Sequence, residues 1–207
     1  MSGPVYRIHT RRLVVRCWNP EDAPAIKAAV DASIEHLRPW MPWAHGEPTD
    51  LEAKIELLRG WRAEFDQGHD FVYGIFCRDD GRVIGSTGLH TGVGPQARMI
   101  GYWVHVDHIN QGYATESSAA LTKVAFQVEN VDRVEIFIAV GNERSAAVPR
   151  KLGYTLEATL RRRGFRPDGP PQDMQIWSLH ADEYPNSPSA MAEIEAFDAI
   201  GRKVLGS

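Results

Sequence analysis

The sequence predicts an α/β fold, in which one mixed, mostly antiparallel sheet of about seven strands is flanked by helices on both faces. Three observations predict it. The composition, 43% hydrophobic and 24% charged over 207 residues, is that of a globular domain long enough to bury a core. Apolar segments of strand length follow one another in the middle of the chain, as in antiparallel hairpins. Later strands alternate with helices, which favours a parallel crossover.

The charge and cysteine content exclude several classes of protein. A net charge of −4 argues against direct binding of nucleic acid, which usually needs a basic excess. Cys17 and Cys77 lie in apolar runs without CxxC spacing, which is typical of reduced core thiols in a cytoplasmic protein. Residues 1–7 lack the apolar core of a signal peptide, and no apolar stretch approaches the ~20 residues of a membrane span.

The first third of the chain predicts one strand followed by two helices. Residues 13–18 are rich in β-branched side chains and predict the strand. Asn19 and Pro20 suit the first positions of a helix that is expected to run to about Asp31. The second helix is predicted over residues 50–66, where apolar side chains recur every three or four positions.

The rest of the chain predicts a hairpin, a β-α-β crossover and a terminal helix. Strands over 71–78 and 82–90 flank Asp79-Asp80-Gly81, which matches an Asp-Gly hairpin turn. The remaining expected elements are strands over 98–106, 133–140, 155–162 and 173–180, helices over 112–128 and 143–152, a linker over 184–188 and an amphipathic helix over 189–205.

The segment from Ile100 to Glu116 contains the first candidate site. A strand ends there, a loop turns, and a helix begins at Gly112. The first N–H groups of a helix have no intrahelical partner and lie at the positive end of its dipole, so they suit a phosphate. Gly112 and Ala114 would let a ligand approach the backbone, and Thr115 adds a hydroxyl. An ordinary capped helix would have the same sequence pattern. No complete P-loop or dinucleotide motif is present to distinguish a phosphate site from it.

A second candidate stretch follows the next predicted strand. Asn142 opens the helix over 143–152, and Ser145 lies three residues further on. Asn142 also suits a plain N-cap role. Two parallel strands that each lead into a helix place their loops at the same end of the sheet, where ligands of such sheets bind.

Together these stretches resemble the acyl-CoA motifs of the GNAT superfamily of N-acyltransferases, and most closely its RimJ/RimL-like branch, which acetylates N-terminal amines of ribosomal proteins. The stretches that carry the resemblance are Thr10–Arg16, Leu37–Trp43, Ile100–Val104, Gly112–Glu116, Asn142–Ser145 and Lys151–Glu157. The resemblance implies a GNAT acyltransferase domain over 1–184, with 185–207 as a C-terminal linker and amphipathic helix. The chain departs from the family's phosphate loop at Ile109, where Gln or Arg is usual, and at Asn110, which replaces a small residue.

The resemblance also implies an activity and a set of site residues. The activity is transfer of an acetyl group, or another short acyl group such as succinyl, from acyl-CoA to a primary amine by direct attack in a ternary complex, with no metal. A backbone N–H near Val104 is expected to stabilise the oxyanion, and Ser145 to protonate the leaving thiolate. The implied catalytic residues are Ser145, Asn142 and His90. The implied cofactor-binding residues are Val104, His105, Val106, Gln111, Gly112, Tyr113, Ala114, Thr115, Asn142 and Ser145.

The general base is left open. The resemblance implies a glutamate in the segment after Leu156-Glu157, but counting along the chain without gaps reaches Gly164, where no carboxylate stands. Glu116 is more simply a charge near a helix terminus. His90, at the end of a predicted strand, could relay a proton through water or be an ordinary polar strand end. A water chain with an exposed amine is the simplest expectation.

The acceptor site is expected to lie between the segment 37–43, the loop after His90 and the loop 163–172. Its expected substrate-binding residues are Trp40, Trp43, Tyr102 and Arg163. The tryptophans could equally fill the core. The arginines Arg161, Arg162, Arg163 and Arg166 could meet an acidic acceptor, an acidic acyl group or a ribosomal surface, or form a solvated strand end.

Two partner questions stay open at this stage. The acceptor could be a small-molecule amine or a protein N-terminus, with no membrane and no direct nucleic-acid partner. The terminal helix could cover the sheet edge or form a homodimer contact. A non-catalytic acyl-CoA-binding sensor is the alternative to an enzyme; the missing glutamate motivates it, and the presence of Asn142 and Ser145 argues against it.

Overall fold

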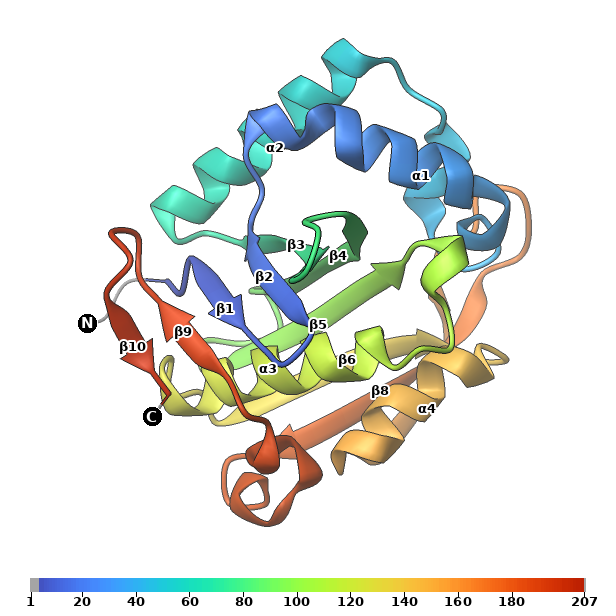
Figure 1. The fold of residues 1–207 in the computed structure, drawn as a ribbon. Helices are drawn as coiled ribbons and strands as arrows, with labels where there is room; N and C mark the ends of the chain where they lie inside the picture. The colour runs from blue at the N-terminus through green and yellow to red at the C-terminus, as the bar shows by residue number, and fades with distance from the viewer. Residues whose placement is uncertain (1–3, 207) are drawn as a thin grey trace.

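The computed structural model describes residues 4–206 and is built on one large mixed sheet (Figure 1). The strand order is β10-β9-β1-β2-β3-β4-β5-β6-β8-β7. Within the described residues every neighbouring pair is antiparallel except β5 and β6, which are parallel. The predicted mixed, mostly antiparallel sheet is therefore confirmed, with ten strands instead of about seven.

The predicted order of helices and strands is confirmed as far as residue 180. The strands are β1 Arg7–His9, β2 Leu13–Cys17, β3 Phe71–Cys77, β4 Val83–His90, β5 Ala97–Val104, β6 Arg133–Ala139, β7 Thr155–Gly164, β8 Gln172–His180, β9 Glu195–Phe197 and β10 Lys203–Leu205. The α-helices are α1 Ala23–Leu37, α2 Leu51–Gln67, α3 Tyr113–Gln127 and α4 Glu143–Leu152. β1 was not predicted, because three residues are too few to show a strand period.

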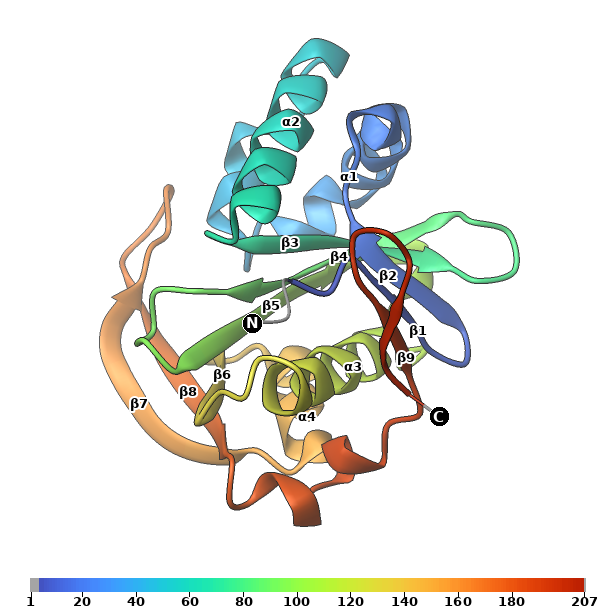
Figure 2. The ribbon, with the colours of Figure 1, turned by 90° about the vertical axis from the view of Figure 1, so that its left-hand side faces the viewer.

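The helices form a layer on each face of the sheet (Figure 2). α1 and α2 cover one face, where Trp18, Ile26 and Leu58 belong to one buried apolar cluster. α3 and α4 cover the other face, where Leu121 and Ile136 belong to a second cluster. The sheet thus lies between two layers of helices, each packed on it by buried apolar side chains.

The sheet opens between β5 and β6. The two strands pair over Ala97–Met99 and Arg133–Glu135 and are not paired further along. β4 holds β5 through the Gly85–Val104 pair, and β8 holds β6 through the Ala139–Met174 pair. Each strand therefore stays paired with its outer neighbour where the two are no longer paired with each other.

The predicted C-terminal helix over 189–205 is wrong. The chain instead forms β9, which pairs with β1, and β10, which pairs with β9. The carboxylate of Asp198 accepts hydrogen bonds from the N–H groups of Ile200 and Arg202, and Gly201 has φ of +79°, which together make a tight turn. The apolar side chains of this segment do not share one buried face, since Ala196 is fully buried and Ile200 is 75% exposed. Residues 1–3 of the predicted acyltransferase domain and residue 207 of the predicted C-terminal segment lie outside the described residues.

No helix within residues 4–206 is long and apolar enough to cross a membrane.

Among the described residues, one ion pair has both of its side chains buried. It joins Lys54 of α2 to Glu47, whose side chains are 2% and 8% exposed. Burial alone would raise the pKa of Glu47, but hydrogen bonds from Lys54 and from the N–H and hydroxyl of Thr49 outweigh it and hold that pKa below its ordinary value. Glu47 is therefore a carboxylate at neutral pH.

Removing one member of this pair is expected to destabilise the fold strongly, because the remaining charge is left buried. We expect Lys54→Met to lower the free energy of unfolding by about 3–5 kcal/mol, measured by urea denaturation. Lys27→Met, which breaks the partly exposed Lys27–Asp31 pair, is the control and should cost less than about 1 kcal/mol. Adding Glu47→Gln to Lys54→Met should recover part of the loss; equal stability of Lys54→Met and the wild type would contradict the buried charge.

Candidate active site

Two cavities meet at the opening between β5 and β6. One has a volume of about 840 Å³ and lies toward α2, and the other has about 650 Å³ and lies along the starts of α3 and α4. We call them the α2 cavity and the α3 cavity. The residues that line both are Trp40, Met41, Tyr102, Trp103, Asn142 and Ser145. Two ligands bound in these cavities would therefore meet beside Tyr102, Asn142 and Ser145.

The α3 cavity is suited to an anion. Gly112, with φ of +81°, precedes the first turn of α3, and no side chain caps that turn. The N–H groups of Tyr113, Ala114 and Thr115 have no carbonyl four residues earlier within the helix, so they are free to bind a ligand. The cavity is also lined by Arg144 and Lys151 of α4, which the sequence analysis did not single out.

The loop before α3 adopts a conformation that explains one departure from the family pattern. Asn110 has φ of +59°, in the left-handed region that asparagine tolerates better than most residues.

Of the predicted cofactor residues around this loop, Val104 lines the α3 cavity, but Gln111, His105 and Val106 do not. The N–H of His105 donates to the carbonyl of Ile84, and the N–H of Val106 donates to the hydroxyl of Ser33.

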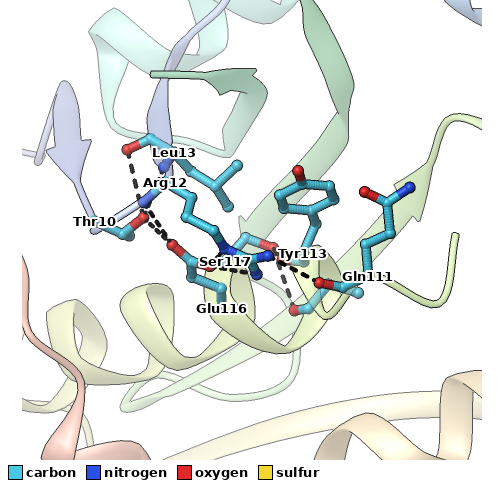
Figure 3. A network of polar contacts seen from close by, with 8 residues as sticks. Thr10, Arg12, Leu13, Gln111, Tyr113, Glu116 and Ser117 are labelled. Atoms are coloured by element: carbon cyan, nitrogen blue, oxygen red, sulfur yellow. Dashed lines mark hydrogen bonds and ion pairs between the residues drawn. The ribbon is translucent and has the colours of Figure 1, made fainter. Parts of the chain in front are cut away.

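The N-terminal hairpin holds this loop in place (Figure 3). One carboxylate oxygen of Glu116 accepts from the hydroxyl of Thr10 and, at 3.0 Å, from the N–H of Arg12; the other accepts from the Arg12 guanidinium at 2.7 Å. Arg12 also donates to the carbonyl of Gln111 at 3.0 Å and lies over the ring of Tyr113, 4.5 Å from its centre. Both Glu116 oxygens are thus occupied, which fits a structural charge near a helix start and not a general base.

Ser145, Asn142 and Tyr102 form one polar group at the junction of the cavities. The side-chain oxygen of Asn142 accepts from the N–H of Ser145 at 3.2 Å, so its N-cap role is confirmed. The Tyr102 hydroxyl lies 3.0 Å from both the carbonyl and the hydroxyl oxygen of Ser145. Burial raises the pKa of Tyr102 well above its ordinary value, so the phenol stays protonated and can donate.

The α2 cavity is mostly apolar, and aromatic side chains gather at it. Trp40, Trp43 and Tyr102, which the sequence analysis expects to bind the acceptor, line it. Arg163 lines neither cavity, nor does the loop 91–96. The aromatic lining residues that the sequence analysis did not single out are Trp61, Trp103, Phe137 and Phe165.

The tip of the β7–β8 hairpin closes one side of the α2 cavity. Asp168 lies 2.6 Å from Nδ1 of His45, which belongs to the short helical segment Pro42–Gly46. Gly164 of β7 does line the cavity, and a Cβ there would lie 2.7 Å from the sulfur of Met174. Among the described residues, no carboxylate of β7 lines this cavity.

His90 also lines the α2 cavity and contacts a carboxylate that sequence reasoning missed. Its Nδ1 lies 2.9 Å from a carboxylate oxygen of Asp70. The register of the predicted hairpin contained this information, because Phe71 pairs with Leu89 and the next residues outward are Asp70 and His90.

The contacts of Glu116 predict a measurable contribution to stability. Glu116→Ala removes the acceptor for three donors of the N-terminal hairpin, and we expect the free energy of unfolding to fall by about 1–3 kcal/mol. Glu56→Ala, which breaks an exposed pair with Arg59 on α2, is the control and should change it by less than about 1 kcal/mol. Equal effects of the two substitutions in urea denaturation would rule out the anchoring role of Glu116.

Comparison with known proteins identifies the family. A family model described as an acetyltransferase (GNAT) domain matches residues 12–155. YdaF of Bacillus subtilis (strain 168), named as a candidate ribosomal N-acetyltransferase, is 28% identical over 174 residues, which are 83% of this chain and 93% of YdaF.

Solved structures share the fold. Mycobacterium smegmatis RimJ in complex with CoA-disulfide is 26% identical, with a TM-score of 0.74 and coverage of 90% of this chain and 91% of RimJ. RimL, a ribosomal L7/L12 alpha-N-protein acetyltransferase solved in complex with coenzyme A, has a TM-score of 0.76 at 24% identity and covers 87% of this chain and 98% of RimL. The fold class predicted from sequence is confirmed, and the non-catalytic sensor is not favoured. The chain belongs to the GNAT family and is an N-acetyltransferase.

Proposed function

We propose that the protein transfers an acetyl group from acetyl-CoA to a primary amine by direct attack while both substrates are bound. The observation that supports this most strongly is the meeting of two chemically different cavities at the β5–β6 opening. The α3 cavity offers helix N–H groups and cations to an anionic cofactor, and the α2 cavity offers an apolar space to an acceptor.

The α3 cavity fits the pyrophosphate of acetyl-CoA. The N–H groups at the start of α3 would bind the phosphate oxygens, and Arg144 and Lys151 would add positive charge. The pantetheine arm would run along Val104 toward Asn142 and Ser145. The remaining members of the implied cofactor set, His105, Val106 and Gln111, would act through the shape of the loop, because they lie outside the lining.

The reaction forms a C–N bond and breaks the C–S bond of the thioester. A neutral amine attacks the carbonyl carbon, and a backbone N–H near Val104 would stabilise the oxyanion. The thiolate leaves with the C–S electron pair, and the proton lost by the attacking nitrogen finally resides on the thiol. When Tyr102 donates to the Ser145 hydroxyl oxygen, the serine proton is free to point at the leaving sulfur.

The acceptor would enter the α2 cavity past Trp40 and Trp43. The names of YdaF and RimL refer to ribosomal proteins, which supports a protein N-terminus, and a small-molecule amine is the other acceptor that fits the cavity. We place the reaction in the cytoplasm, without a metal, and retain succinyl transfer and a homodimer as predictions. Arg163 would then act only on a part of the acceptor outside the cavity.

The cofactor site is tested by filling the space beside the first turn of α3. Gly112→Trp should abolish binding of acetyl-CoA in a calorimetric titration, because the indole would occupy the space of the pyrophosphate. Gly68→Trp is the matched control, since Gly68 also has a positive φ (+75°), lies in open space and lines neither cavity. Wild-type affinity in Gly112→Trp would contradict the assignment, as would equal losses in the two variants.

The role of Ser145 is tested by separating turnover from binding. Ser145→Ala should lower kcat by about tenfold or more and leave acetyl-CoA affinity within about twofold. The reason is that the hydroxyl protonates the sulfur only as the C–S bond breaks and adds little to binding of the intact thioester. Tyr102→Phe should change kcat in the same direction by a smaller factor. Unchanged kcat for CoA release in Ser145→Ala would remove the residue from the mechanism.

A further inference from the structure

His90 and Asp70 both line the α2 cavity and are hydrogen-bonded to each other, and the steps proposed above give neither residue a role. The Asp70 oxygens lie 2.9 and 3.1 Å from Nδ1 of His90, and one of them also accepts from the N–H of Thr91. Burial alone would raise the pKa of Asp70, but the hydrogen bonds from His90, Thr91 and Phe71 outweigh it and hold that pKa below its ordinary value. Asp70 is therefore a carboxylate at neutral pH.

The contact with Asp70 decides which ring nitrogen carries the proton. A carboxylate can only accept, so Nδ1 of His90 must donate to it. In the neutral imidazole Nε2 then keeps its lone pair. Within residues 4–206 no hydrogen bond occupies Nε2, which leaves it available to water or an amine.

Two glycines make room for the ring. A Cβ on Gly88 would lie 2.2 Å from Nε2, and a Cβ on Gly101 would lie 3.4 Å from it. Gly88 and Gly101 are partners in the β4–β5 ladder, and both line the α2 cavity. The imidazole thus lies in a recess that exists because neither strand has a side chain there.

The other ionisable groups of the cavity are already occupied. Glu47 and Lys54 are paired with each other, and Tyr102 is bonded to Ser145. Among the ionisable residues of this lining, His90 is thus the one with a ring nitrogen that no other residue of 4–206 occupies, and β7 contributes Gly164 here and no carboxylate.

We propose that Asp70 is a positioning residue, which holds His90 with the Nε2 lone pair toward the acceptor and so makes His90 the general base for the amine. The proposal rests on the proposed function. The acceptor ammonium gives one proton to Nε2, directly or through a water, and becomes the nucleophile. The imidazolium is stabilised by Asp70 and then releases the proton to solvent through the open cavity. The net reaction converts the ammonium and the thioester into an amide, a thiol and one H⁺ that is released to solvent.

The test follows CoA release at saturating acetyl-CoA with an alanine-starting peptide and with a small primary amine, over pH 5.5 to 9.5. Asp70→Asn keeps an acceptor for Thr91, so melting temperature and acetyl-CoA affinity should stay near wild type. We expect kcat to fall by about 10- to 100-fold at pH 7, and the acidic limb of the kcat profile to move to lower pH, because the imidazolium loses its anionic partner.

His90→Ala should lower kcat at pH 7 by about 100-fold or more and lose the acidic limb, with activity rising at high pH as solvent supplies neutral amine. The double variant should be no slower than His90→Ala, because Asp70 acts only through His90. Gly88→Ala, which would displace the ring, should lower kcat, whereas Gly60→Ala, in open space on α2 and outside the lining of both cavities, should not.

Additive losses in the double variant, or an unchanged pH profile in Asp70→Asn, would overturn the proposal. Failure of the proposed function looks different: the wild type itself would then release no CoA with either amine. Activity of the wild type together with wild-type rates in His90→Ala would leave acetyl transfer intact and refute the base.

Discussion

The short parallel pairing of β5 and β6 is the constraint on which the site depends. The strands share only three residue pairs and then separate, because β4 and β8 hold them from outside. A continuous sheet would isolate the core beneath α1 and α2 from the core beneath α3 and α4. The opening instead lets two cavities share Tyr102, Asn142 and Ser145, so the geometry of the sheet sets where acetyl transfer can occur.

The two cavities differ in charge in a way that suits two different substrates. The chain carries a net charge of −4, yet the α3 cavity combines free helix N–H groups with Arg144 and Lys151. Arg12, a further cation near this loop, is neutralised by Glu116 and holds the loop through the carbonyl of Gln111. In the α2 cavity Lys54 and Glu47 cancel, which leaves an apolar wall and the His90–Asp70 pair.

Much of the fold could be predicted from sequence because its signals are local. The apolar stripe of α2 and its Asp50 cap, whose carboxylate accepts from the N–H of Ala53 at 2.8 Å, lie within one segment. The C-terminal prediction failed because the local apolar spacing suits a helix, whereas the pairing of β9 with β1 joins distant parts of the chain and leaves no local signal. The same limit applies to the site: the start of α3 could be predicted, whereas the Arg12–Glu116 contact spans 104 residues. Asp70 could have been found from the register of the predicted hairpin, since it lies across from His90.

The measurement that tests the central claim most directly is the initial rate of CoA release as acetyl-CoA and an acceptor amine are varied together. Direct attack across the shared junction requires both substrates to be bound at once. The account therefore predicts intersecting lines in double-reciprocal plots, and no acetylated protein when acetyl-CoA is supplied alone. Parallel lines with a stable acetyl-enzyme would show a covalent two-step route and would contradict the meeting of two filled cavities at Ser145.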